Sequence, residues 1–211
     1  MDRMKVVKIA RTYEGVKKGS ELHHKLIDTF NTVKPDGYTA KYSDHWCAEA
    51  VTAWFILAYK KEAKHLMALS ASCPRMIKRA KAMGIWVESD RYHPLPGDVV
   101  LYDWQDSGKG DNKGVADHVG IVSKTGQKNF WVIEGNKGLE SVVGIRKLEV
   151  NALYIRGFIV PDYDGSEKAK ISKMADDVLK GKYGNGEKRK KALGKYYEAV
   201  QKEVNRRLSK K

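Results

Sequence analysis

Residues 44–59 read Asp-His-Trp-Cys-Ala-Glu-Ala-Val-Thr-Ala-Trp-Phe-Ile-Leu-Ala-Tyr, a polar start followed by an almost continuous apolar run. The run is long enough for a buried helix, and Cys47 would lie in the first turn of that helix. The helix dipole and the free backbone N–H groups at such a position favour a thiolate and can donate to an oxyanion. The stretch therefore predicts a buried helix that begins with a candidate nucleophile, Cys47.

The segments on either side of this stretch indicate an α+β domain. Apolar residues at spacings of three or four predict three further helices, at 6–13, 22–30 and 76–83. Short runs rich in β-branched and aromatic residues predict four strands, at 99–102, 119–122, 129–133 and 154–160. Because the helices precede the strands, the pattern favours an α+β architecture with an antiparallel sheet.

A second, more basic unit follows the strands. The stretch Pro-Asp-Tyr-Asp-Gly-Ser at 161–166 is typical of an exposed connection, so we expect a first domain over 1–160, a linker over 161–167 and a second domain over 168–211. The last 51 residues carry 15 basic and 8 acidic side chains, which is half of the basic excess of the whole chain. Their apolar residues recur at helical spacing and predict a small three-helix bundle.

Charge and composition limit the function. The 211 residues have a formal net charge of +14, which implies a polyanionic partner such as nucleic acid, anionic lipid or a bacterial cell-wall polymer. No helix-turn-helix, zinc-finger or RNP-like string is present, so we expect no specific nucleic-acid partner. The longest apolar run, 50–59, is about half of what a membrane span requires, so we expect no membrane insertion. Nothing in the sequence demands an oligomer, and we expect a monomer.

A base and an orienting group for Cys47 can be found on the predicted strands. His118 stands at the front of the strand Val-Gly-Ile-Val, where it could present its imidazole to a thiol on a neighbouring helix. The period of two along the next strand places Glu134 and Asn136 on one face, and either could accept a hydrogen bond from the ring of His118. The oxyanion would be stabilised by the backbone N–H of Cys47, together with the hydroxyl of Tyr38 or Tyr42.

Four fragments, in this order, resemble the CHAP family of cysteine, histidine-dependent amidohydrolases/peptidases: Asp-His-Trp-Cys-Ala-Glu at 44–49, Pro-Gly-Asp-Val-Val-Leu-Tyr at 96–102, Ala-Asp-His-Val-Gly-Ile-Val at 116–122 and Val-Ile-Glu-Gly-Asn at 132–136. The resemblance covers about 13–160. It implies a papain-like α+β fold that cleaves peptidoglycan, with Cys47 as nucleophile and His118 as base. Glu134 and Asn136 would be the orienting and polar-support residues. Amidase and endopeptidase activity both remain open.

The tail is similar to a single CW_7 repeat, the cell-wall-binding module of Cpl-7-type phage lysins. The resemblance implies a three-helix bundle that recognises peptidoglycan, and the residues expected at its wall-binding surface are Tyr183, Gly184, Asn185, Gly186 and Arg189. Residues 1–15 contain no apolar stretch typical of a signal peptide, so we expect none. Together these features predict a phage or prophage endolysin, made in the host cytoplasm without a signal peptide and released to the wall by a holin.

Several simpler interpretations compete with these. The protein could be a non-catalytic, basic cell-wall-binding protein, and Cys73 is expected to be a packing residue or a surface thiol. Without a CxxC or Cys/His metal spacing, no disulfide framework and no structural zinc site are expected.

A glycine-rich loop offers the only candidate metal ligands, Asp103, Asp106 and Asp111. Their spacing differs from the EF-hand pattern, and Lys109 and Lys113 would oppose a cation. We therefore expect no cofactor, with calcium as the weaker alternative.

Overall fold

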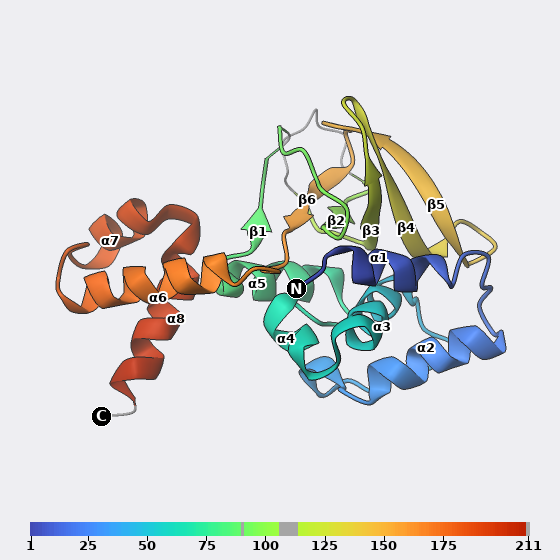
Figure 1. Ribbon diagram of the computed structural model, residues 1–211, viewed down its shortest axis with the longest axis horizontal. Helices are drawn as coiled ribbons and strands as arrows, with labels where there is room; N and C mark the ends of the chain where they lie inside the picture. The colour runs from blue at the N-terminus through green and yellow to red at the C-terminus, as the bar shows by residue number, and fades with distance from the viewer. Residues whose placement is uncertain (90, 106–113, 210–211) are drawn as a thin grey trace.

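The computed structural model describes residues 1–89, 91–105 and 114–209 of the chain. A layer of helices lies against a six-stranded antiparallel sheet, and three further helices extend to one side (Figure 1). The predicted α+β class, with N-terminal helices and an antiparallel sheet, is confirmed. In the described part of the chain, no helix has both the length and the apolar character needed to cross a membrane.

The helical layer is built around one buried helix. Its members are α1 (Met4–Arg11), α2 (Glu21–Asn31), α3 (Cys47–Tyr59), α4 (Ala63–Leu66) and α5 (Cys73–Met83). Every residue of α3 except Leu57 is buried, as the continuous apolar run predicts. Helices α1 and α2 and strands β3 and β4 all pack on α3, and α1 also contacts β3. The position of Cys47 is therefore fixed by the centre of the fold.

The sheet has the order β1-β6-β2-β3-β4-β5, with antiparallel neighbours throughout. Its strands are β1 (Trp86–Val87), β2 (Val99–Tyr102), β3 (His118–Thr125), β4 (Asn129–Lys137), β5 (Val142–Glu149) and β6 (Ile155–Ile159). The four predicted strands are confirmed as β2, β3, β4 and β6. Two strands were not predicted: β1, which has two residues, and β5, an edge strand that exposes Ile145, Lys147 and Glu149 and buries only Val143.

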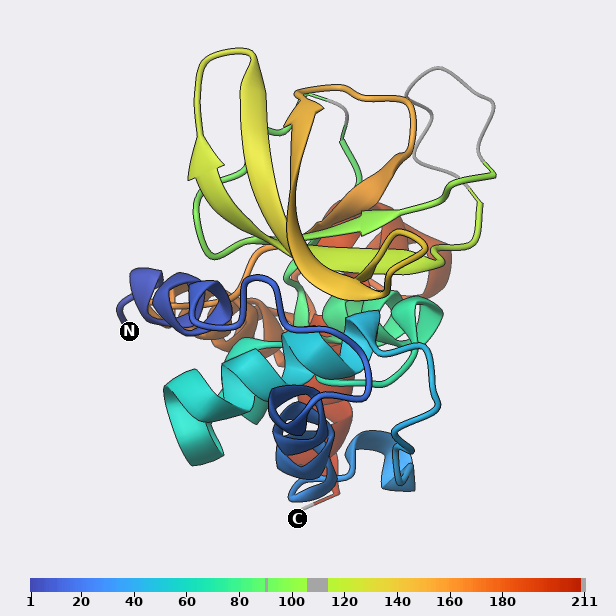
Figure 2. The same ribbon diagram turned by 90° about the vertical axis from the view of Figure 1, so that its right-hand side faces the viewer.

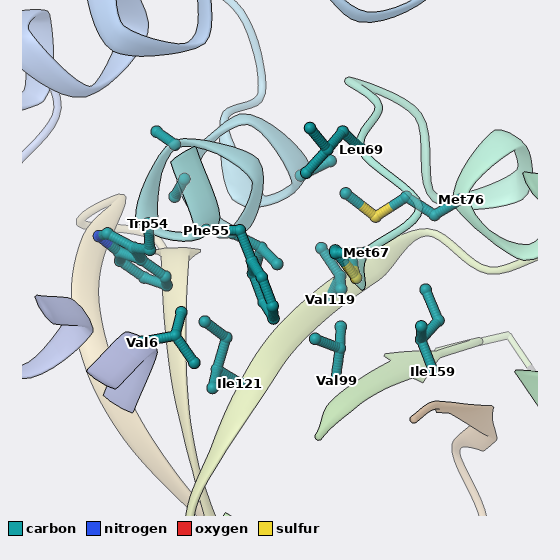
Figure 3. Close-up of a cluster of buried hydrophobic side chains, with 14 of the residues drawn as sticks. Val6, Trp54, Phe55, Met67, Leu69, Met76, Val99, Val119, Ile121 and Ile159 are labelled. Atoms are coloured by element: carbon teal, nitrogen blue, oxygen red, sulfur yellow. The ribbon is translucent and has the colours of Figure 1, made fainter. Parts of the chain in front are cut away.

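Each face of the sheet has its own core. On the face toward α3, side chains such as Val99, Val119 and Ile121 pack against Trp54 and Phe55 (Figure 3). The opposite face holds a smaller cluster that contains Phe130, Val132 and Phe158. Figure 2 shows the strands rising from the helical layer. The first residue of β3, His118, hydrogen-bonds with Cys47 at the start of α3, and Gly135 near the end of β4 approaches Ala50 of the same helix.

The C-terminal helices form a small bundle, as predicted: α6 (Ser166–Leu179), α7 (Gly186–Leu193) and α8 (Tyr197–Leu208). Helix α6 begins at Ser166, within the stretch 161–167 expected to be a linker. The bundle contacts the first unit through α8 and α5. Gly84 ends α5 with φ +75°, and a Cβ at this position would lie 2.9 Å from Ile171 of α6. A side chain there would strain both the helix end and the contact with the bundle.

Candidate active site

Cys47 is the first residue of α3 and is 6% exposed. A hydrogen bond from the thiol of Cys73 lowers the pKa of Cys47 well below its usual value. Burial acts in the opposite direction, while hydrogen bonds with His118 and with the backbone N–H of Ala48 lower the pKa further. The arrangement stabilises a thiolate at the N-terminus of a helix, where the helix dipole also favours negative charge.

His118, the first residue of β3, connects Cys47 to Glu134. Its Nε2 atom lies 3.3 Å from Oε2 of Glu134, and the ring also hydrogen-bonds with Cys47. Burial by itself would lower the pKa of His118, but these two partners outweigh burial and raise it to about 9. A depressed thiol pKa and a raised imidazole pKa favour a thiolate–imidazolium pair at neutral pH.

Glu134 of β4 is fully buried and is held by a residue that the sequence analysis missed. Nε of Arg146 donates to Oε1 of Glu134 over 2.7 Å, while Oε2 faces His118. The guanidinium of Arg146 also lies over the ring of Trp104, 4.7 Å from its centroid. Burial would raise the pKa of Glu134, but His118 and Arg146 lower it, so the carboxylate stays charged. Arg146 lies on β5, the edge strand that the hydrophobic pattern did not reveal.

Asn136 does not contact His118, so the expected face shared by Glu134 and Asn136 is not observed. The pairing of β4 with β5 shifts register between Glu134 and Lys137, and Asn136 has φ +54°. This irregularity breaks the period of two. The amide nitrogen of Asn136 instead lies 3.3 Å from Nδ1 of His45, and the hydroxyl of Ser141 donates to its carbonyl oxygen.

The glycine between these two residues brings β4 against α3. A Cβ on Gly135 would lie 2.6 Å from Cβ of Ala50 and 3.2 Å from the ring of Trp46. Real side chains cannot approach so closely, so only glycine permits this contact between strand and helix. The Glu-Gly-Asn string thus provides a carboxylate for His118 and a close approach to the helix that carries Cys47.

Cys73 is a second residue that the sequence analysis underestimated. It is the first residue of α5, is 5% exposed and hydrogen-bonds through its thiol with Cys47. The bond to Cys47 and burial raise the pKa of Cys73 well above its usual value, so it remains a neutral donor. Of the two alternatives expected for Cys73, a packing residue or a surface thiol, its burial agrees with the first, but its contact with the nucleophile depends on tertiary structure that sequence spacing does not reveal.

Comparison with family models gives two matches: a CHAP domain over residues 37–136 and a CW_7 repeat over residues 172–208. The chain contains a CHAP domain followed by a CW_7 repeat. Searches of curated proteins and of solved structures found no match. The CHAP match includes Cys47, His118, Glu134 and Asn136, and it supports a peptidoglycan hydrolase. The CW_7 match supports cell-wall binding.

The two tyrosines expected near the oxyanion of the CHAP domain have other partners. The hydroxyl of Tyr38 donates to Oδ2 of Asp44 over 2.8 Å, and that of Tyr42 donates to Oδ1 of Asp28 over 2.8 Å. Each hydroxyl proton is thereby used by a carboxylate, which raises the pKa of both phenols. The backbone N–H of Cys47 remains the expected oxyanion donor.

The candidate metal ligands lie only partly within the described residues. Asp103 is buried and its Oδ1 accepts a hydrogen bond from the backbone N–H of Gln105, whereas Asp106 and Asp111 lie outside the described residues. In the ranges 1–89, 91–105 and 114–209, no three His, Cys, Asp or Glu side chains are grouped so that they could hold a metal ion.

The residues expected to bind the wall lie together at the junction of α6 and α7 in the CW_7 repeat. Arg189 fixes this segment: Nε donates to the carbonyl oxygen of Gly184 over 2.9 Å, and one terminal nitrogen donates to Oδ1 of Asn185 over 2.8 Å. Its other terminal nitrogen reaches Oε1 of Gln201 on α8, 3.2 Å away. Arg189 therefore supports the shape of the loop, in which Gly181, Gly184 and Gly186 have positive φ angles.

Proposed function

We propose that the protein cleaves an amide bond of peptidoglycan by acyl transfer through Cys47. The observation that carries this proposal is the hydrogen-bonded series Cys47–His118–Glu134–Arg146, in which a thiolate and an imidazolium are both stabilised. Nucleophile, base and orienting group are the three roles that such catalysis needs. The CHAP match supports this chemistry independently of the geometry.

The reaction would proceed in two steps. The Cys47 thiolate attacks the amide carbonyl, and the backbone N–H at the start of α3 stabilises the tetrahedral oxyanion. His118 then protonates the departing amine, which leaves a thioester on Cys47. In the second step His118 accepts a proton from water, the resulting hydroxide attacks the thioester, and the thiolate is regenerated. Glu134, held by Arg146, keeps the imidazole oriented and stabilises its charged form.

The CW_7 repeat would hold the enzyme on its polymeric substrate. We propose that Tyr183, Gly184, Asn185, Gly186 and Arg189 contribute to the wall-binding surface, and that the basic charge of the bundle attracts wall anions. A cysteine hydrolase attached to a wall-binding repeat is the architecture of a phage or prophage endolysin. We propose that role, in which the protein, made in the host cytoplasm, reaches the wall after holin-type release and acts as a monomer.

The test is mass spectrometry of fragments released from purified Gram-positive peptidoglycan, with Cys47→Ala as the parallel control. Free lactyl groups on muramic acid with intact stem peptides would identify an N-acetylmuramoyl-L-alanine amidase. New peptide termini with an intact glycan–stem bond would identify an endopeptidase. Absence of fragments from walls of several chemotypes, together with retained wall binding, would contradict the hydrolase and favour the non-catalytic wall-binding protein.

A further inference from the structure

A cavity of about 440 Å³ lies beside the nucleophile, and the catalytic series does not use it. Its walls come from the segment before α3, from the first turn of α3 and from the segment that leads into α5. Glu49 lines it two residues after Cys47, and Asp44 lines it three residues before Cys47. Cys47 itself does not line the cavity, but Glu49 is close enough for the charge of Cys47 to raise its pKa, so a group bound here would lie near the nucleophile.

Glu49 is the unusual residue of this cavity. Its side chain is buried, with 2% of the residue exposed, and Oε2 has no hydrogen-bond partner among the described residues. Burial, followed by the negative charges of Cys47 and Asp44, raises the pKa of Glu49 to about 8. A buried carboxyl group without a partner is costly, and such groups are normally satisfied by protein, water or ligand.

The hydrogen bonds of the other acidic residues show which carboxylate oxygens of the cavity already have partners. Asp36 is already paired, because its Oδ1 accepts from Arg79 over 2.6 Å and its Oδ2 accepts from Ser70 over 2.8 Å. Asp44 accepts two hydrogen bonds, from Tyr38 and from the backbone of Lys41, and both of them reach Oδ2. Among the described residues, Oδ1 of Asp44 and Oε2 of Glu49 accept no hydrogen bond. Oε2 lies below the accessible surface, so a ligand must move its cover to reach it, and the ammonium of Lys18, bonded to the carbonyl oxygen of Asp44 over 2.7 Å, is the cation already near both carboxylates.

Two acceptors fit an ammonium group better than a metal ion. Calcium takes six to eight oxygen ligands, and the described residues hold no group of three His, Cys, Asp or Glu side chains suited to a metal. An ammonium needs at most three acceptors, and its charge would lower the pKa of Glu49 again and ionise it. Arg75, an exposed cation on the same cavity, could pair with a carboxylate beside that ammonium.

We propose that this cavity is the subsite for an ammonium-bearing side chain of the peptidoglycan stem, with Glu49 as its carboxylate partner and Asp44 as the second acceptor. The proposal rests on the proposed hydrolase function and adds a substrate class to it: stems with a diamino acid whose side-chain amine is free. Glu49 then determines specificity and takes no part in bond cleavage.

The experiment uses the full-length protein and soluble muropeptides prepared with the side-chain amine of the stem either free or acetylated. For the wild type, we expect acetylation to raise KM about 10-fold or more, with kcat changed less than about 2-fold, because a buried charge-assisted contact is lost. Glu49→Gln should show the high KM on both substrates. Glu14→Gln, an exposed carboxylate of the same domain outside the cavity, should behave as wild type.

Three results would overturn the proposal. The first is an equal KM of the wild type for free and acetylated muropeptides, a comparison that needs no variant to fold. The second is a loss of kcat in Glu49→Gln by the same factor on both substrates. The third is loss of wild-type activity with EDTA and its return with calcium on both substrates, with no such response in Glu49→Gln, which would assign the cavity to a metal ion. Failure of the hydrolase function would look different, because the wild type would cleave neither muropeptide.

Discussion

The CHAP domain buries several polar and charged side chains, whereas the CW_7 repeat keeps its charged side chains near the surface. In the described part of the chain, every buried acidic, histidine, serine or threonine side chain lies between His23 and Glu134. The bundle buries apolar side chains and tyrosine, and its charges pair near the surface, as Arg207 does with Glu203 over 2.7 Å. Buried charges interact strongly and shift each other's pKa, whereas exposed charges are screened by salt. The first region is therefore suited to chemistry and the second to adhesion.

The largest effect on activity should come from changes in the hydrogen-bonded series Cys47–His118–Glu134–Arg146. Cys47→Ala and His118→Ala should each lower lytic activity by more than about 10³-fold, because either change removes a reacting group that its neighbours cannot replace. Turbidity loss of a wall suspension measures this activity. Wall sedimentation is the binding control and should remain close to wild type, since the bundle is unchanged. Thermal unfolding checks that each variant is folded at the assay temperature, and His118→Ala should unfold at a lower temperature because it leaves the buried Glu134 with one partner fewer. A folded Cys47→Ala protein with normal lysis would contradict the assigned nucleophile.

A smaller effect is expected from the second partner of Glu134. Arg146→Met removes the 2.7 Å hydrogen bond to Oε1, so the pKa of Glu134 should rise and His118 should be oriented less well. We expect kcat to fall about 10-fold with little change in KM, because orientation acts on the reaction and not on binding. The matched control is Lys147→Met, the exposed neighbour on β5, which should behave as wild type. Equal kcat values for the two variants would show that Arg146 does not support the site.

Cys73 should affect the pH dependence more than the maximal rate. Activity needs the thiolate of Cys47, so it rises with pH through the depressed thiol pKa. It also needs the imidazolium of His118, so it falls as pH rises through about 9. Cys73→Ala removes the donor that contributes most to the low pKa of Cys47, so the acid limb should move to higher pH.

The rate of alkylation by iodoacetamide against pH reports this shift directly. The wild type carries two thiols, so the alkylated peptide is identified by mass spectrometry, and the rate at Cys47 is compared between the two proteins. The basic limb of the activity profile, which His118 sets, should stay near its wild-type position. A movement of both limbs together would indicate a general disturbance of the site and not the loss of one hydrogen bond.

The sequence was informative where local pattern determines structure. The apolar run after Cys47 can only be a core helix, and β-branched runs such as 119–122 have few alternatives to a buried strand. The four motifs and their order were enough to predict that Cys47, His118 and Glu134 lie close together. Edge strand β5 escaped detection because it has only one buried residue, Val143, and exposes Ile145 as well as Lys147 and Glu149, so no clear apolar pattern marks it, and Arg146 was lost with it.

Long-range contacts account for what the sequence could not predict. The bulge in β4 turns Asn136 toward His45, although strict alternation would have kept it beside Glu134. The contact of Cys73 with Cys47 joins the first residues of two helices that are 26 positions apart, and no periodicity links them. Similarly, the unpartnered carboxyl oxygen of Glu49 follows from burial by several segments, and a single sequence does not contain that information.

The smallest expected effect tests the adhesive region alone. Arg189→Lys keeps the charge but loses the fork that joins Gly184, Asn185 and Gln201, since an ammonium cannot make these three contacts in one plane. Wall retention in a sedimentation assay should fall about 3-fold. This is the effect expected when the loop loses the net stabilisation of about one hydrogen bond. Cleavage of soluble muropeptides should be unchanged, because the catalytic series lies in the other domain.

Arg11→Lys, at an exposed arginine of α1, is the matched control for the same conservative change. If both variants are retained on the wall as well as the wild type, the junction of α6 and α7 is not the binding surface. If Arg189→Lys slows soluble cleavage as well, the two regions are coupled through the contact of α8 with α5, and adhesion and chemistry are not separable in this protein.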